Sequence, residues 1–319
     1  MKSRWGIMLG VLFLVLATSC RGATPATNPT TTQSPTYPPE LVRRPAFAGQ
    51  FYTANAEKLA AEIDGYMAGK EPTAGRPLAL IVPHAGYMFS GPVAGYAYAE
   101  VRDEQYEAVI LIGPNHYLHD FPGVAVYPGG AWQTPLGQVP VHTELAEAIL
   151  QANPEFERDP ARHAQDHSLE VQIPFLQRAL PGTPIVPILI GYPYPENAQA
   201  LIEALSQVLV GRDVLLIASS DLSHYPAYDD AVRVDGAILA AIETLDTSQV
   251  RQTITEEMVQ EVPNLVTTCC GEEAIVVVIE VAKALGATRA TVLHYANSGD
   301  VPGGDRTRVV GYGAVKIAK

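Results

Sequence analysis

The chain has 319 residues, of which 47% are hydrophobic, enough to bury a core in one large domain or two small ones. Acidic residues outnumber basic ones by 34 to 21, for a net charge of −13, and no basic run follows the first few residues. This composition argues against a nucleic-acid partner, and three cysteines are too few for a disulfide scaffold.

The first 20 residues have the pattern of a targeting segment. Lys2 and Arg4 precede a short apolar core, Ile7–Leu16. The following ATSC, which ends at Cys20, resembles the lipobox of a bacterial lipoprotein signal, with Ala17 where Leu is commoner. In such proteins the cysteine becomes the lipidated first residue, so we expect an exported cell-envelope lipoprotein with a lipid anchor on Cys20. The alternatives are an ordinary cleaved signal peptide or an uncleaved anchor, and both also place the domain outside the cytoplasm.

A tether is expected over residues 21–44. Thr, Pro, Ser and Ala dominate its first part, up to about Pro39, and such a composition cannot bury a core. The folded domain is therefore expected over residues 45–319, opening with the aromatic segment Pro45–Tyr52.

Strands and helices alternate along this domain. Short apolar runs predict strands at 78–82, 108–112, 123–127, 185–190, 214–218, 290–294 and 309–317. Apolar residues at helical spacing predict helices at 55–68, 92–101, 143–152, after 168, and at 196–210, 229–245, 247–259 and 272–285. Residues 129–140, rich in Gly and Pro, are expected to form a loop. Without internal repeats, this pattern predicts a single α/β domain with a central, mainly parallel or mixed sheet flanked by helices.

Histidines follow two of the predicted strands directly. His84 comes after the first strand and His116 after the second, at the carboxyl ends where open α/β sheets bind ligands. One such histidine would more often be structural, but two at equivalent strand ends predict a metal site, since neutral imidazoles are common metal ligands. Cys270 is the candidate third ligand because the helix that starts there favours a thiolate; the alternative is a packed thiol, as we expect for Cys269.

Further ionisable residues lie in comparable positions. Asp221 and His224 follow the strand at 214–218 and are candidates for ligands, for groups that orient ligands, or for an acid/base pair. His167, between Asp166 and Glu170, is either a base with its orienting partner or part of a solvent-facing loop.

Eight motifs, taken together and in order, resemble the Memo family, whose bacterial and archaeal members are called AmmeMemoRadiSam system protein B. They are PAFAGQFY (45–52), PHAGYMFSG (83–91), ILIGPNH (110–116), QTPLG (133–137), DHSLEVQIPFL (166–176), SSDLSHY (219–225), TCCG (268–271) and YANSGD (295–300). The resemblance runs from about Pro45 to Ile317. It implies a fold like that of the class III extradiol (LigB-type) dioxygenases, which bind non-haem iron.

The resemblance also implies a metal site. The two histidines and the cysteine that line the site in Memo-like proteins, and hold iron or copper, map onto His84, His116 and Cys270; zinc is a further candidate. The nearby Asp and His map onto Asp221 and His224, and the His-Ser-hydrophobic-Glu motif maps onto His167 and Glu170. Two features depart from the family: a second thiol, Cys269, adjoins Cys270, and typical members lack an export signal.

Three functions are compatible with these residues. The first is a mononuclear iron- or copper-dependent oxidoreductase with a small-molecule substrate, in which His167, Asp221 or His224 moves protons. Extradiol enzymes use a carboxylate as the third ligand, so dioxygenase activity does not follow from the fold. The second is a metal-binding or redox module without turnover. The third is a metal-independent hydrolase using Cys270 or Ser223 with His224, although no Gly-x-Ser-x-Gly elbow is present. The sequence names no protein partner.

Overall fold

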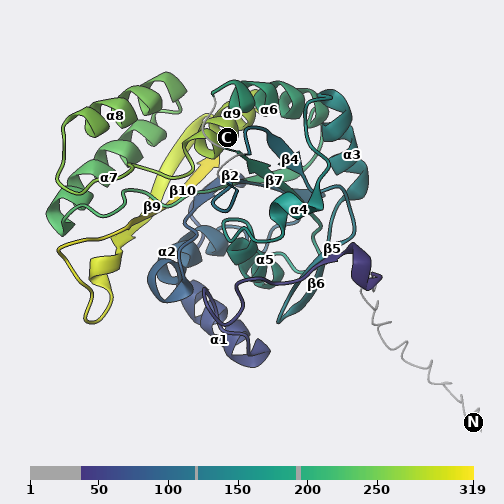
Figure 1. Ribbon diagram of the computed structural model, residues 1–319, viewed down its shortest axis with the longest axis horizontal. Helices are drawn as coiled ribbons and strands as arrows, with labels where there is room; N and C mark the ends of the chain where they lie inside the picture. Colours follow the sequence, from purple (N-terminus) through teal and green to yellow (C-terminus); the bar gives the residue numbers. More distant parts are fainter. Residues whose placement is uncertain (1–36, 119–120, 192–194) are drawn as a thin grey trace, which may run out of the picture. The chain divides into compact units, whose positions relative to one another are not determined.

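A mixed sheet of seven strands forms the centre of the protein. The computed structural model describes residues 37–118, 121–191 and 195–319 (Figure 1). The strand order is β4-β7-β3-β8-β2-β10-β9. Its four inner strands run parallel, and they are β7 (Ile185–Ile190), β3 (Ala108–Pro114), β8 (Val214–Ser219) and β2 (Pro77–Val82). Antiparallel pairing adds β4 (Val124–Val126) on one side and β10 (Gly311–Ala318) with β9 (Arg289–Asn297) on the other. This arrangement confirms the predicted fold class.

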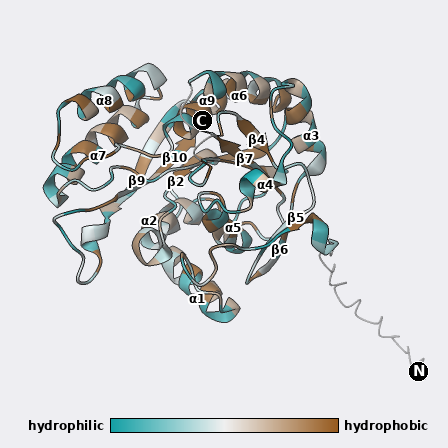
Figure 2. Cartoon of the chain, in the orientation of Figure 1, coloured by the Kyte–Doolittle hydropathy of each residue, from teal (hydrophilic) through white to brown (hydrophobic). Residues whose placement is uncertain are grey.

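Helices cover both faces of the sheet, which explains why its inner strands are apolar on both sides (Figure 2). One layer contains α1 (Ala56–Met67), α2 (Tyr87–Ala99) and α5 (Ile173–Ala179). The other contains α3 (Thr143–Ala152), α6 (Pro195–Val208) and α9 (Glu272–Ala284). The pair α7 (Tyr228–Glu243) and α8 (Thr247–Val259) packs beside β9 and β10. Short helical turns lie at α4 (Pro160–His163), η1 (Pro39–Leu41), η2 (Glu170–Gln172) and η3 (Ser298–Asp300).

Helix α2 begins five residues earlier than the sequence indicated. Pro92 was the expected first residue, but the helix starts at Tyr87 and contains Pro92. A proline inside a helix removes one backbone hydrogen bond, here to the carbonyl of Met88, which lies at the exposed surface. The helix packs closely on α1 at Gly95, where an added Cβ would lie 2.2 Å from the carbonyl oxygen of Tyr66.

The expected loop at 129–140 is instead a β-hairpin. Strands β5 (Ala131–Thr134) and β6 (Gly137–Pro140) pair antiparallel across a two-residue turn. The prediction was wrong because the Gly and Pro residues lie at the ends of the strands, while the buried Trp132 anchors the hairpin. The short β1 (Val42–Arg43) completes a three-stranded sheet by pairing parallel with β5. The last residues of the expected tether are therefore part of the folded unit.

Arg43 attaches this N-terminal segment to the centre of the protein. Its guanidinium is buried, packs 4.2 Å from the centroid of the Trp132 ring and donates to Glu170 Oε2 at 2.7 Å. It also donates to the carbonyl oxygens of His163 and Asp166 at 2.7 and 2.9 Å. The Glu170 carboxylate accepts three further hydrogen bonds, from the amides of residues 46 and 47 and from the Tyr52 hydroxyl. The pair is thus a buried junction with its hydrogen-bonding groups paired.

The expected signal, the lipidated Cys20 and most of the tether lie outside the described residues. Among residues 37–118, 121–191 and 195–319, no helix combines the length and the apolar character needed to cross a membrane.

Replacing Arg43 by Met should strongly destabilise the fold. The variant keeps most of the packing on Trp132 but leaves the Glu170 carboxylate buried without its cation, which costs about 3–5 kcal/mol. We expect urea unfolding to show a loss of this size in the free energy of unfolding. Arg178→Met is the matched control: its ion pair with Asp64 is exposed, and its loss should cost at most about 1 kcal/mol. Equal effects of the two substitutions would contradict this account.

Candidate metal centre

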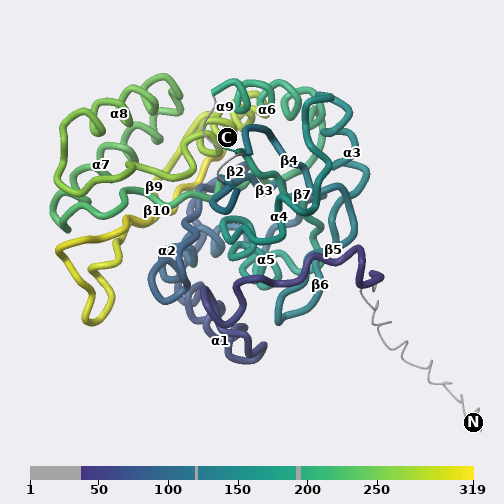
Figure 3. The backbone as a smooth tube through the Cα atoms, viewed as in Figure 1, coloured from purple at the N-terminus to yellow at the C-terminus, as the bar shows by residue number. Residues whose placement is uncertain are grey.

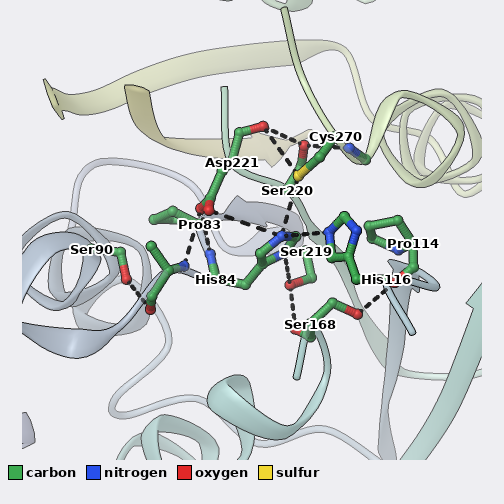
Figure 4. Close-up of polar contacts among 12 residues, drawn as sticks. Pro83, His84, Ser90, Pro114, His116, Ser168, Ser219, Ser220, Asp221 and Cys270 are labelled. Atoms are coloured by element: carbon green, nitrogen blue, oxygen red, sulfur yellow. Dashed lines mark hydrogen bonds and ion pairs between the residues drawn. The ribbon is translucent and has the colours of Figure 1, made fainter. Parts of the chain in front are cut away.

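The predicted site residues come together at the carboxyl edge of the sheet. His84 lies two residues beyond β2, His116 two beyond β3, and Asp221 two beyond β8. The two histidine-bearing strands are not neighbours, because β8 lies between them. Cys270, two residues before the start of α9, approaches the same edge (Figure 4). The central strand β8 therefore separates the two histidines and contributes polar groups of its own to the space between them.

Two possible ligand atoms lie close to His84 Nε2 at this edge. His84 Nε2 lies 3.2 Å from His116 Nε2 and 3.2 Å from Cys270 Sγ. A ring nitrogen of His167 lies within 4.8 Å of nitrogens of both other histidines, so the three imidazoles form a group able to hold a metal ion. His84 is buried, whereas the other two histidines are partly exposed. The group therefore has a buried side and a side open to solvent.

A hydrogen-bond network fixes the tautomer of His84 (Figure 4). Ser219 Oγ, at the end of β8, lies 2.6 Å from the carbonyl oxygen of Ser168, and this contact needs the only hydroxyl proton. Gln172 Nε2 donates to the same oxygen at 2.8 Å. His84 Nδ1, 3.0 Å from Ser219 Oγ, must then carry the hydrogen and donate it. Nε2 is left with a free lone pair that faces His116 and Cys270.

The partners of this serine are themselves fixed. The second hydrogen of the Gln172 amide goes to the carbonyl oxygen of Pro83 at 2.9 Å, and its oxygen accepts from the Tyr98 hydroxyl at 2.7 Å. The four side chains of this hydrogen-bonded series, which runs from Tyr98 through Gln172 and Ser219 to His84, are all buried. Because each hydrogen-bonding group of this series has a partner, the orientation of the His84 ring is tightly determined.

Burial keeps the candidate ligands uncharged near neutral pH. Desolvation, followed by the proximity of the other histidines, holds the pKa of His84 well below its ordinary value. Desolvation also lowers the pKa of His116 and of His167, although Asp166 acts in the opposite direction on both. The Cys270 thiol has its pKa raised well above the usual range by burial and then by the Asp221 charge. The imidazoles are therefore neutral and the thiol is protonated.

Asp221 holds the loop of His84 and stays at the edge of the ligand group. Its Oδ1 accepts from the backbone amides of His84 and Ala85 at 2.7 and 3.2 Å. Its Oδ2 lies 4.0 Å from His84 Nε2. Burial raises the pKa of Asp221 to about 7, although the two amide hydrogen bonds oppose the shift. A proton on this group therefore belongs on Oδ2, on the side of the histidines.

His167 forms a wall of the site together with aromatic rings. Its imidazole stacks on that of His116 with centroids 5.1 Å apart and lies 4.6 Å from the Phe51 ring. Glu170 was a candidate partner for His167, but its carboxylate is buried and holds the segment that carries Phe51. Asp166 likewise accepts from the backbone amides of His116 and Ser168, at 2.7 and 2.8 Å. Both acids thus position the chain around His167.

His224 lies near the ligand group, while the neighbouring Ser223 points elsewhere. His224 Nδ1 donates to the carbonyl oxygen of Leu222 at 2.9 Å, which leaves Nε2 as its free acceptor. The Ser223 hydroxyl is buried and has no hydrogen-bond partner among the described residues. A Ser223–His224 pair is therefore not formed. Cys269 is buried, and desolvation raises the pKa of its thiol above the ordinary range, in keeping with the packing role expected for it.

Sequence reasoning missed the residues that orient the site. Ser219 and Gln172 were present in two of the motifs, but neither has a spacing that signals a contact with His84. Arg43 was assigned to the tether, and nothing local marks it as the partner of Glu170, 127 residues away. Only the strand order brings these groups together.

Comparison with known proteins agrees with the sequence motifs. The model of the family described as Memo-like protein matches residues 43–316. A MEMO1 family protein of Aquifex aeolicus (strain VF5) is 41% identical over 276 residues, covering 85% of this chain and 97% of that protein. A MEMO1 family protein of Ignicoccus hospitalis is 37% identical over 291 residues, covering 87% of this chain and 99% of that protein.

A solved structure, that of the uncharacterized protein JW3007 from Escherichia coli K12, aligns with a TM-score of 0.47 and 13% identity, covering 75% of this chain and 99% of that one. This likeness says nothing about function. The family model and the two relatives, each of which spans most of the chain, establish that this protein belongs to the Memo family.

Proposed function

We propose that the protein binds one iron or copper ion through His84, His116 and Cys270 and uses it as an oxidoreductase. The observation that carries the proposal is the approach of two possible ligand atoms, His116 Nε2 and Cys270 Sγ, to within 3.2 Å of His84 Nε2. Imidazole and thiolate ligands together suit iron and copper, and also zinc, which lacks redox chemistry.

The spacing of the donor atoms fits a shared ion. Two nitrogens, each about 2.1 Å from one metal and about 90° to 109° apart at it, lie about 3.0 to 3.4 Å from each other. The His84–His116 separation of 3.2 Å falls in this range. The free lone pair on His84 Nε2 is a second point of fit, because a ligand nitrogen must be unprotonated. His167 can bind the same ion or face the substrate.

The surrounding groups supply proton transfer. A bound iron or copper ion would contribute one-electron redox chemistry and Lewis acidity. Asp221 can hold a proton on Oδ2 and release it near pH 7, since burial raises its pKa to about 7. His167 and the free Nε2 of His224 are further proton acceptors, kept neutral because burial lowers the pKa of both rings. These groups favour catalysis over simple metal storage, for which none of them is needed.

We also propose that the domain is held at the cell envelope by a lipid on Cys20. The charged start, the apolar core Ile7–Leu16 and the ATSC motif support this location. Expressed in a bacterium that processes lipoproteins, the full-length protein should incorporate radiolabelled palmitate, and Cys20→Ser should abolish the labelling while Cys269→Ser retains it. Palmitate labelling of Cys20→Ser would contradict the lipid-anchor assignment.

Elemental analysis should find about one equivalent of iron or copper in the purified protein. His84→Ala, His116→Ala and Cys270→Ser should each lose it, because each removes one of the proposed ligand atoms. His294→Ala is the control, since this ring stacks on Tyr96 outside the ligand group and should leave the metal content unchanged. Metal-dependent oxygen consumption, lost in His84→Ala, would support turnover; full metal content in His84→Ala would refute the site.

The pH dependence of metal affinity should identify the thiol as a ligand. The Cys270 thiol is protonated near neutral pH, because burial raises its pKa, so a metal-bound thiolate must release one proton. Affinity for cobalt(II) should then rise with pH between about pH 6 and about pH 8. For each pH unit, the affinity of the wild type should gain an extra factor of about ten compared with Cys270→Ser. The neutral imidazoles contribute little over this interval. Equal slopes in both proteins would exclude Cys270 as a ligand.

Ser219→Ala should weaken zinc binding without removing a ligand. The variant leaves the Nδ1–H of His84 without its acceptor, so the ring no longer prefers the tautomer with a free Nε2. Loss of such an orienting hydrogen bond costs about ten- to a hundredfold in metal affinity. Nitrogen NMR shifts of the His84 ring should show mixed tautomers in the metal-free variant. Ser223→Ala, which removes a buried hydroxyl without a partner, should change neither; an equal effect would point to general destabilisation instead.

A further inference from the structure

A cavity of about 570 Å³ lies between the first turn of α2 and the connection from β9 to β10. In Figure 3 this connection, the yellow hairpin, runs out past α2. The cavity walls are mainly apolar and include the rings of Phe89, Tyr225 and Tyr312. Two charged side chains line it, Arg308 and Asp305. Pockets of this kind, with apolar walls and few polar groups, commonly bind small molecules.

The positive charge in this cavity is available to a ligand. The Arg308 guanidinium stacks over the Tyr225 ring, 4.0 Å from its centroid, and forms no ion pair with any carboxylate in the described part of the chain. The nearby Arg306 also stacks on a tyrosine, Tyr228, but lies 3.8 Å from Asp300. One oxygen of the Asp305 carboxylate, Oδ1, accepts from the amide and the hydroxyl of Thr307 within the same loop.

Tyr225 connects this cavity to the metal centre. Its ring contacts both Arg308 and the His224 ring, and the centroids of the two rings are 5.6 Å apart with their planes at 83°. The backbone of Tyr225 is strained, with φ at 75°, a value that bulky residues rarely adopt. Hydrogen bonds hold it there: Tyr225 N donates to Val309 O at 2.6 Å, and His224 N to Thr267 O at 2.9 Å. Backbone strain of this kind persists only where the surrounding structure fixes the conformation, and it is common at functional sites.

We propose that this cavity binds the carboxylate end of a small organic acid with an aromatic or apolar body, and that this acid is the substrate class of the metal centre. Arg308 binds the carboxylate as a charge-assisted pair. Phe89, Tyr225 and Tyr312 pack against the body, and the His224 ring contacts Tyr225 beside the cavity. The identification as substrate rests on the proposed function; the binding itself does not.

The test uses phenylacetate and the metal-free, full-length protein. We expect phenylacetate to bind in an NMR or calorimetric titration, and phenylacetamide, which lacks the charge, to bind more weakly. Arg308→Met should weaken phenylacetate binding by about ten- to a hundredfold, the effect of losing a hydrogen bond to a charged group. Arg306→Met is the matched control and should bind like the wild type, because that arginine does not line the cavity.

The outcomes separate this inference from the proposed function. Absence of phenylacetate binding by the wild type, or equal affinity in wild type and Arg308→Met, overturns the acid-binding site. Because the titration is done without metal, a failure to find iron or copper in the protein leaves its result intact. Conversely, a protein that holds metal but does not bind phenylacetate retains the metal centre and loses only the assignment of substrate class.

Discussion

The orientation of the His84 ring, at the candidate metal site, depends on one hydroxyl proton. Ser219 has a single hydrogen to give, and the carbonyl of Ser168, 2.6 Å away, takes it. That oxygen must then act as the acceptor in its other two contacts, in which Gln172 Nε2 and His84 Nδ1 are the donors. The lone pair on His84 Nε2 is therefore a consequence of backbone geometry at the end of β8, and it exists before any ion binds. Preorganisation of this kind lowers the cost of assembling a ligand group.

Buried carboxylates build the walls around that centre. Glu170 gathers Arg43, two backbone amides and the Tyr52 hydroxyl, and so holds the segment whose Phe51 ring packs on His167. Asp166 ties the turn after β3 to the loop of His167. The oxygens of both carboxylates therefore accept hydrogen bonds that hold the segments around the site. The centre itself keeps neutral donors, and Asp221 is the acid of the group that can change its protonation near pH 7.

The sequence predicts where the candidate site residues lie better than it predicts which residues hold them in place. Strand ends are readable from apolar runs, which is why His84, His116 and Asp221 were expected at one edge before the strand order was known. Pairings across the chain, such as Arg43 with Glu170, carry no local signal, because they depend on where distant strands pack. The hairpin at β5 and β6 shows a different limit: Gly and Pro mark chain reversals equally well at strand ends and in loops. The early start of α2 likewise reflects packing against α1, which local propensity does not contain.

The third ligand of the proposed site would decide what chemistry a bound metal could support. In extradiol enzymes that position is a carboxylate, and the carboxylate nearest His84 here is Asp221. Its Oδ1 is occupied by two backbone amides, and its Oδ2 lies 4.0 Å from His84 Nε2, farther away than the Cys270 sulfur at 3.2 Å.

A cation that binds at Cys270 must first displace the thiol proton, and Asp221, with its pKa raised to about 7, is an adjacent group that can accept it. In the proposed site two tasks that one carboxylate could have combined would be separate: the sulfur would bind the ion, and the acid beside it would pass the thiol proton on to solvent.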